Sequence, residues 1–193
     1  MANVDSPFGF KPVRYLSGGP YNGATNVYST AAGDGTLIGI GDPVTYSGTS
    51  QTIGGVVYVD VKRAATGDIV LGVMTSVVPA TRDSTIYRAA STATLINVAD
   101  DPNLIFEIQE VSGGTALTTA ALGLNVDFVV ADASTTTGRS GVELNNATEA
   151  ATNTLDLLLV GFVNREGNEV GEHAKWYVRL NKHQFVDQKV GKA

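Results

Sequence analysis

The sequence contains no cysteine, only two histidines and one tryptophan, and no long apolar run. Without cysteine, disulfide bonds and thiolate metal ligands are excluded. The longest apolar run, residues 157–163, is too short for a membrane-spanning helix, which needs about 20 residues. Residues 1–7 lack the basic and apolar regions of a signal peptide. We therefore expect a soluble protein that does not contact a membrane and is not exported by a signal peptide.

The scarcity of imidazole and thiol groups also limits catalytic chemistry. His173 and His183 are the available imidazole bases, and neither lies in a nucleophile motif. The acidic pair at residues 100–101 lacks the spacing of a calcium loop, and the glycines at residues 39–41 lack the third glycine of a dinucleotide-binding loop. A pair of carboxylates for glycoside hydrolysis remains an open alternative, because the distance between the two groups is set by the fold and not by their spacing in the sequence. We expect no catalytic, metal-binding or cofactor-binding residues, and a protein that is not an enzyme.

Charge is unevenly distributed along the chain. The net charge is −6, which argues against non-specific nucleic-acid binding because that binding depends on basic side chains. Residues 1–14 and 174–193 together sum to +5, whereas the remainder sums to −11. The basic residues of these two ends are Lys11, Arg14, Lys175, Arg179, Lys182, Lys189 and Lys192. The ends could therefore contact an acidic surface on their own body, on a neighbouring copy or on another protein, or could simply be solvated.

Period-two patterns predict many short strands. After a turn at residues 100–103, Leu104, Phe106 and Ile108 share one strand face, which we expect in the core. Glu107 and Gln109 lie on the other face, which we expect in solvent. Trp176 shares a predicted core face with Val178 and Leu180 in the same way. Other strands are expected at residues 25–30, 37–40, 43–46, 56–61, 69–74, 85–88, 93–98, 126–130 and 155–163.

The intervening segments complete the predicted fold. Residues 47–55 are rich in Ser, Gly and Thr and predict a loop, and residues 115–122 predict one short helix capped by Gly123. Strands at roughly ten-residue spacing, separated by turn residues, are typical of a barrel or sandwich. The sequence therefore predicts an all-β, single-domain β-barrel or β-sandwich over residues 17–193, with no repeat.

The first sixteen residues differ from the rest of the chain. They contain two prolines and two phenylalanines without a strand or helix period, which predicts an extended N-terminal arm over residues 1–16. Aromatic side chains on a segment without its own core must be buried against another surface. We therefore expect an interface formed by Phe8, Phe10, Lys11, Arg14 and Tyr15.

Five blocks of the sequence resemble recurring blocks of virion proteins of tailed bacteriophages. These blocks are NVDSPFGFKPVR (3–14), IGDPV (40–44), GLNVD (123–127), TGRSGV (137–142) and VRLNKHQ (178–184). In these blocks the chain is similar to capsid decoration, or cement, proteins. The resemblance implies a virion structural protein, made in the host bacterial cytoplasm, that sits as a homotrimer on the outer surface of the capsid. It further implies that the major capsid protein is the partner, whose lattice the trimer stabilises, and that no active site is present.

The sequence is also compatible with a second function, that of a binding module. A β-sandwich with long Ser, Thr and Gly loops would also suit a virion-displayed module that binds carbohydrate or a host surface. Such modules usually expose several aromatic side chains, and the sole tryptophan, Trp176, is predicted to be buried. Exposure of Trp176 would therefore favour the binding module, and its burial would favour the cement protein.

Overall fold

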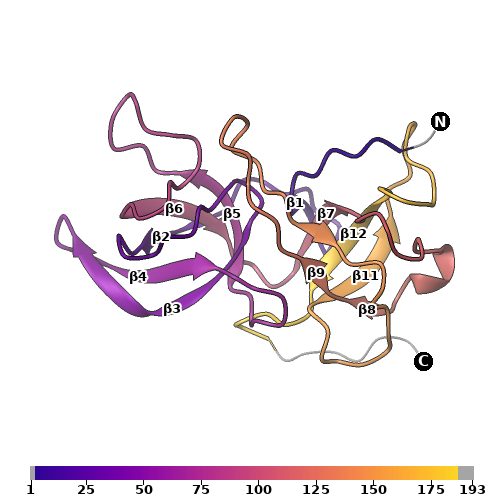
Figure 1. Ribbon diagram of the computed structural model, residues 1–193. Helices are drawn as coiled ribbons and strands as arrows, with labels where there is room; N and C mark the ends of the chain where they lie inside the picture. Colours follow the sequence, from indigo (N-terminus) through magenta and orange to yellow (C-terminus); the bar gives the residue numbers. More distant parts are fainter. Residues whose placement is uncertain (1–2, 187–193) are drawn as a thin grey trace.

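Two β-rich lobes lie side by side in the computed structural model, which describes residues 3–186 (Figure 1). Asp187, Lys189 and Lys192, which contribute to the expected charge of the C-terminal end, lie outside the described residues. One lobe is a closed barrel with the order β2-β4-β3-β5-β6. Its strands are β2 (Asn26–Thr30), β3 (Pro43–Ile53), β4 (Val56–Arg63), β5 (Gly72–Val77) and β6 (Thr94–Ala99).

The other lobe is built on an open five-stranded sheet with the order β1-β7-β12-β11-β8. Its strands are β1 (Lys11–Tyr15), β7 (Leu104–Gln109), β8 (Asn125–Val126), β11 (Leu157–Phe162) and β12 (Lys175–Leu180). A two-stranded ladder of β9 (Phe128–Val129) and β10 (Glu143–Leu144) lies beside it. The prediction of an all-β fold is confirmed, and half of the chain forms the predicted barrel.

Each lobe has an apolar core, and the larger core crosses the boundary between them. The barrel core contains Leu71, Met74 and Ile96. The core of the sheet lobe includes Val70 and Val73, which belong to the barrel half of the chain. The two lobes are therefore joined by shared buried side chains.

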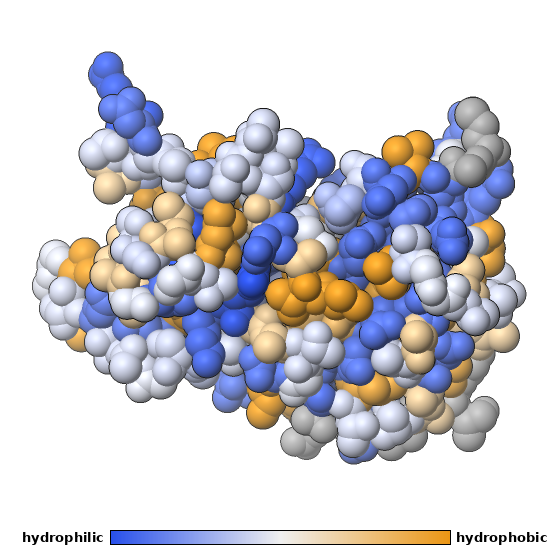
Figure 2. Space-filling view, in the orientation of Figure 1, coloured by the Kyte–Doolittle hydropathy of each residue, from blue (hydrophilic) through white to orange (hydrophobic). Residues whose placement is uncertain are grey.

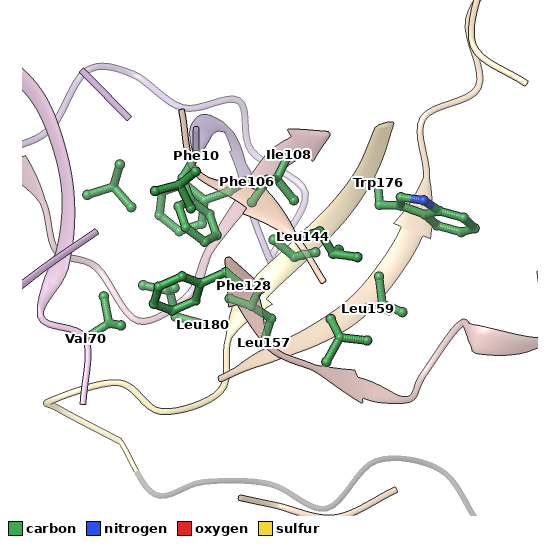
Figure 3. Close-up of a cluster of buried hydrophobic side chains, with 14 of the residues drawn as sticks. Phe10, Val70, Phe106, Ile108, Phe128, Leu144, Leu157, Leu159, Trp176 and Leu180 are labelled. Atoms are coloured by element: carbon green, nitrogen blue, oxygen red, sulfur yellow. The ribbon is translucent and has the colours of Figure 1, made fainter. Parts of the chain in front are cut away.

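Three aromatic rings form the centre of the larger core (Figure 3). Phe10 lies edge-on against Phe106 and Phe128, with ring centroids 5.9 Å and 5.8 Å apart. Trp176 is fully buried and packs edge-on against Phe162 at 5.0 Å. Edge-to-face pairs of this kind contribute about 0.5 to 1.5 kcal/mol beyond the burial of their apolar area. The predicted burial of Trp176 is confirmed.

The two strands and the turn expected around residues 100–103 form, but the strands do not pair as a hairpin. β6 pairs within the barrel, whereas β7 pairs within the open sheet and is buried on both faces. The amide N–H groups of Asn103 and Leu104 donate to the side chain and carbonyl of Asp101, which closes the turn. Glu107 and Gln109 are buried, so the expectation that they face solvent is wrong. The N-terminal segment and the β11–β12 loop contact them there, through bonds to Asp5, Ser6 and Arg165, and a single-strand pattern cannot reveal such a cover.

The predicted N-terminal arm is also wrong in part, because its second half belongs to the body. Residues 11–15 form β1, which pairs antiparallel with β7, and Phe10 is only 2% exposed. A bulge between Pro12 and Arg14 shifts the register of β1. This shift breaks the period of two, which is why the sequence showed no strand pattern.

Two further local predictions need correction. Instead of the predicted helix over residues 115–122, the chain makes one 3₁₀ turn, Thr119–Ala121, whose N-cap is Thr118. Gly123 does follow it at φ 83°. The predicted loop over residues 47–55 is a continuous β3–β4 hairpin with its turn at residues 54–55, and a bulge between Tyr46 and Ser50 accounts for the missing pattern.

The surface mixes polar and apolar side chains. Figure 2 shows that apolar residues on this face lie in small patches, one of them near the middle of the view. In the described part of the chain, no helix has the length and apolar character needed to cross a membrane.

Candidate functional site: a cation-lined groove between the lobes

A groove of about 480 Å³ lies where the N-terminal segment passes between the two lobes. We call it the basic groove. Its apolar lining consists of Phe8, Phe10, Pro12, Tyr21, Ile40 and Met74. Its charged lining consists of Lys11, Glu107, Arg139, Arg165 and Lys175, and Ser6 and Thr75 complete it. The groove therefore combines an apolar surface with four cations and one carboxylate.

The strand order of the sheet brings basic residues from both ends of the chain to one face. Because β7 lies between β1 and β12, Lys11 and Tyr177 both pair with Glu107, and Lys175 pairs with Gln109 in the next row. Paired residues on neighbouring strands project to the same side of a sheet. Cations that are far apart in the sequence therefore lie close together here.

Glu107 is neutralised within the groove. Its carboxylate is buried and forms an ion pair of 2.6 Å with Arg165, whose side chain is about half exposed. Within residues 3–186, Lys11, Arg139 and Lys175 make no ion pair with a carboxylate. The groove consequently presents three positive charges that are not compensated by the described part of the protein.

A close contact between two loops positions Arg139 at the groove. The amide N–H of Ile40 donates to the Gly138 carbonyl at 2.8 Å, and that of Ser140 donates back to Ile40 at 2.9 Å. The buried carboxylate of Asp42 accepts hydrogen bonds from the Ser140 hydroxyl and, at 2.7 Å, from the Gly39 amide. Burial raises the pKa of Asp42 to about 6, although both hydrogen bonds oppose that shift.

The N-terminal wall of the groove is held in place before any ligand arrives. The Asn3 side chain donates to the carbonyls of Glu169 and Glu172 at 2.8 and 2.9 Å and accepts from the Glu169 amide at 2.9 Å. The Ser6 amide donates to the Gln109 side chain at 3.2 Å. Gly9 has φ 69°, and a Cβ there would lie 2.5 Å from the Gly41 carbonyl oxygen, so only glycine fits without displacement.

A second cluster of polar groups lies under the same N-terminal segment. Asp5, Glu143 and His173 place one possible metal-ligand atom each within 4.8 Å of one another. The buried amide of Gln109 donates to Asp5 at 3.1 Å and to Glu143 at 3.0 Å, and it lies 3.5 Å from His173 Nδ1. The amide nitrogen thus already fills the position between these groups, so we interpret the cluster as an anchor for the N-terminal segment.

The electrostatics of this anchor follow from its burial. Burial raises the pKa of Glu143, the hydrogen bond from Gln109 opposes the shift, and the charge of Asp5 adds to it. His173 has an unusual φ of 59° for a residue other than glycine. No sequence pattern indicated this cluster, because its members come from four separate segments.

The five predicted interface residues divide into two groups. Phe8, Phe10 and Lys11 line the basic groove, although Phe10 is also a core residue. Arg14 and Tyr15 do not line it: the Arg14 guanidinium lies 5.8 Å from the centre of the Tyr177 ring, and the Tyr15 hydroxyl donates to the side chain of Asn22 at 3.0 Å. Three of the five residues thus lie at the groove, and their role in an interface stays a prediction.

The cations contributed by Arg139 and Arg165 were missed as site residues. Both come from polar loops without a strand or helix pattern, and only the folded chain places them beside Lys11. Chemically, the groove can bind an anionic group through charge-assisted hydrogen bonds and can cover an apolar side chain at the same time.

Comparisons with known proteins add no relative to this description. No protein-family model matches the chain, and neither a curated protein nor a solved structure matches it. Function is therefore inferred from the residues and their geometry, together with the resemblance of the five sequence blocks.

Proposed function

We propose that the protein is a virion structural protein, a capsid decoration protein that binds the outside of a tailed-phage head as a trimer. In this role it stabilises the lattice of the major capsid protein and performs no catalytic step. The observation that carries the proposal is that residues 3–14, the longest block of the resemblance, build one wall of a preformed basic groove. A binding surface made by that block fits a protein whose function is to attach to a shell.

The alternative, a carbohydrate or host-surface binding module, is less well supported. Its expected aromatic platform would need the sole tryptophan, and Trp176 is fully buried in the larger core. Phe8, Phe10 and Tyr21 line a groove that also carries cations, which favours an acidic protein partner over a neutral sugar.

The proposal can be tested on heads of the parent phage, purified from its bacterial host. The expected result is a stoichiometric band of this chain on the heads, and density for three copies around each occupied three-fold position in cryo-electron micrographs. Glycan-array binding with no band on the heads would support the alternative. Absence of the chain from the heads, or its presence inside them, would contradict the proposal.

A further inference from the structure

We propose that the basic groove binds a short acidic peptide segment that also carries an apolar side chain, presented by a partner protein. The inference rests on the proposed function only for the identity of that partner, which would be the capsid shell. The recognition chemistry itself follows from the residues of the groove and can be tested without any phage particle.

The charges around the groove favour an acidic ligand. The protein has a net charge of −6, yet Lys11, Arg139 and Lys175 surround the groove without a carboxylate partner among residues 3–186. Holding three like charges around one depression is unfavourable unless an opposite charge compensates them. Carboxylates of Asp or Glu would do so, and an arginine can bind them through two parallel hydrogen bonds.

The apolar lining of the groove favours a ligand that also carries an apolar side chain. Phe8 is half-buried, and with the partly buried Pro12 and Ile40 it gives the groove an apolar wall. A purely ionic ligand would leave this surface in water, whereas burying an apolar side chain there is favourable. The volume of about 480 Å³ lies in the range typical of ligand pockets, roughly 300 to 1,000 Å³.

The outer edge of β1 is closed to a further strand. β1 is an edge strand, but Pro12 has no N–H, and the Val13 carbonyl already accepts a hydrogen bond from the Tyr21 amide at 3.0 Å. A peptide cannot extend the sheet along an edge that is occupied in this way. Recognition must therefore use side chains, which makes the acidic and apolar character of the segment decisive.

The groove is also preorganised. Asn3 and Ser6 anchor its N-terminal wall, and Phe10 holds the following residues in the core. A ligand therefore does not need to order this segment on binding, which lowers the entropic cost of association. A short segment can bind measurably under these conditions.

A peptide is favoured over a nucleic acid for this groove. Three uncompensated cations neutralise few phosphates, and the acidic remainder of the protein repels a long polyanion. A peptide with two or three carboxylates matches the charge of the groove and avoids that repulsion.

The test uses the isolated full-length protein labelled with ¹⁵N and titrated in an NMR experiment. The probe is an acetylated hexapeptide of alternating Glu and Leu with one central Phe, and the comparison probes are the same peptide with Lys for Glu and a six-nucleotide oligothymidine. We expect saturable shifts of amide signals around residues 8–12 and 139 with the acidic peptide alone, at concentrations up to about 5 mM. Raising the salt concentration should weaken binding.

Matched variants locate the binding site. Lys11→Gln combined with Arg139→Gln removes two exposed groove charges and should weaken binding by about tenfold or more. Lys62→Gln combined with Arg82→Gln removes two exposed charges away from the groove and should leave binding unchanged. Both variants change only residues that lie outside the core. Their NMR spectra should therefore show the same signal dispersion as the spectrum of the parent protein.

Several results would overturn the inference. They are the absence of shifts at the highest peptide concentration, equal weakening by both variant pairs, or binding of the oligonucleotide with no binding of the acidic peptide. The proposed function fails separately: if the peptide binds in the groove but the protein is absent from heads, the groove assignment stands and the partner is another protein. If the groove variant loses the peptide but still decorates heads normally, the shell uses a different surface and the inference about the shell is wrong.

Discussion

Trp176 is held both by ring packing and by a hydrogen bond to a buried carboxylate. Its indole N–H donates to Glu110 at 2.8 Å, and the same carboxylate accepts from the Leu117 amide and the Asn146 side chain. Burial raises the pKa of Glu110, and these three bonds act in the opposite direction. One acidic residue thus connects β12 with the loops that follow β7 and β10.

Replacing this tryptophan tests the core directly. Trp176→Ala should lower the free energy of unfolding by about 3 to 5 kcal/mol, because it leaves a cavity and removes a donor from a buried carboxylate. Urea unfolding measures the effect, and Trp176→Phe, which keeps a ring without the donor, should cost less. Since the chain has one tryptophan, its emission should be blue-shifted and poorly quenched by iodide. Free quenching in the native protein would contradict the assignment.

His183 makes stability depend on pH. It is buried, its Nδ1 accepts a hydrogen bond from the Phe185 amide, and burial lowers its pKa from 6.5 to about 4, with the charges of Asp100 and Asp101 acting in the opposite direction. Between these two pKa values the unfolded chain binds a proton that the folded chain does not bind. The contribution of His183 to stability is therefore complete above about pH 6.5 and falls as the pH is lowered towards 4.

The corresponding measurement compares the protein with His183→Gln. The stability of the parent relative to this variant should decrease by up to about 3 kcal/mol between pH 7 and pH 4, as followed by urea unfolding. The buried acids whose pKa values are raised, such as Asp42, have the opposite slope, but they cancel in the comparison because both proteins contain them. If the difference in stability between the two proteins does not change with pH, the pKa of His183 is not lowered in the folded protein.

The burial of a residue could be predicted from the sequence only where it depends on which face of its strand the residue occupies. Alternation placed Trp176, Val178 and Leu180 in the core correctly. The same reasoning failed for Glu107 and Gln109, because a distant segment and a loop cover the outer face of β7. Such a cover depends on tertiary contacts that a local pattern does not contain.

At the scale of elements, the N-terminal segment is part of the folded body. Deleting residues 2–14 would remove most of β1 together with Phe10, so we expect loss of the cooperative unfolding transition and a changed circular dichroism spectrum. Phe10→Ala alone should cost about 3 to 5 kcal/mol. Phe8→Ala is the control, because Phe8 is half-buried beside the groove and should affect folding less. A truncated protein with an unchanged spectrum and stability would show that the segment does not belong to the core.

Two segments that the sequence did not reveal as strands, β1 and the outer part of β3, share one physical cause. Both contain a bulge, which shifts side chains from one face to the other and interrupts the period of two. By contrast, β7 and β12 pair through several consecutive residues without a shift, and both were predicted. The register also shifts in β5 and β11, but these strands were predicted from their apolar runs and not from alternation. Without such a run, the bulged segments were taken for an arm and a loop.

At the scale of the whole molecule, the fold turns an uneven charge distribution along the chain into a localised basic surface. The sequence showed that both ends are basic, but not that β1 and β12 lie on either side of β7. The loop cations Arg139 and Arg165 join Lys11 and Lys175 only through contacts between the lobes and within the sheet lobe. The candidate site thus depends on topology, which the sequence alone did not establish.

The proposed function also requires a particular assembly. A decoration protein at a three-fold position of an icosahedral shell is matched by closed three-fold symmetry, in which the same contact repeats between successive copies. We therefore expect light scattering of the free protein at micromolar concentration, or of the protein detached from heads, to give three times the chain mass of 20.1 kDa. Repeating the measurement over a tenfold dilution separates a defined trimer from concentration-dependent aggregation, because a closed ring has no larger species. A purely monomeric mass both free and on heads would count against the decoration role, whereas a monomer that becomes trimeric on heads would show that the shell itself organises the three copies.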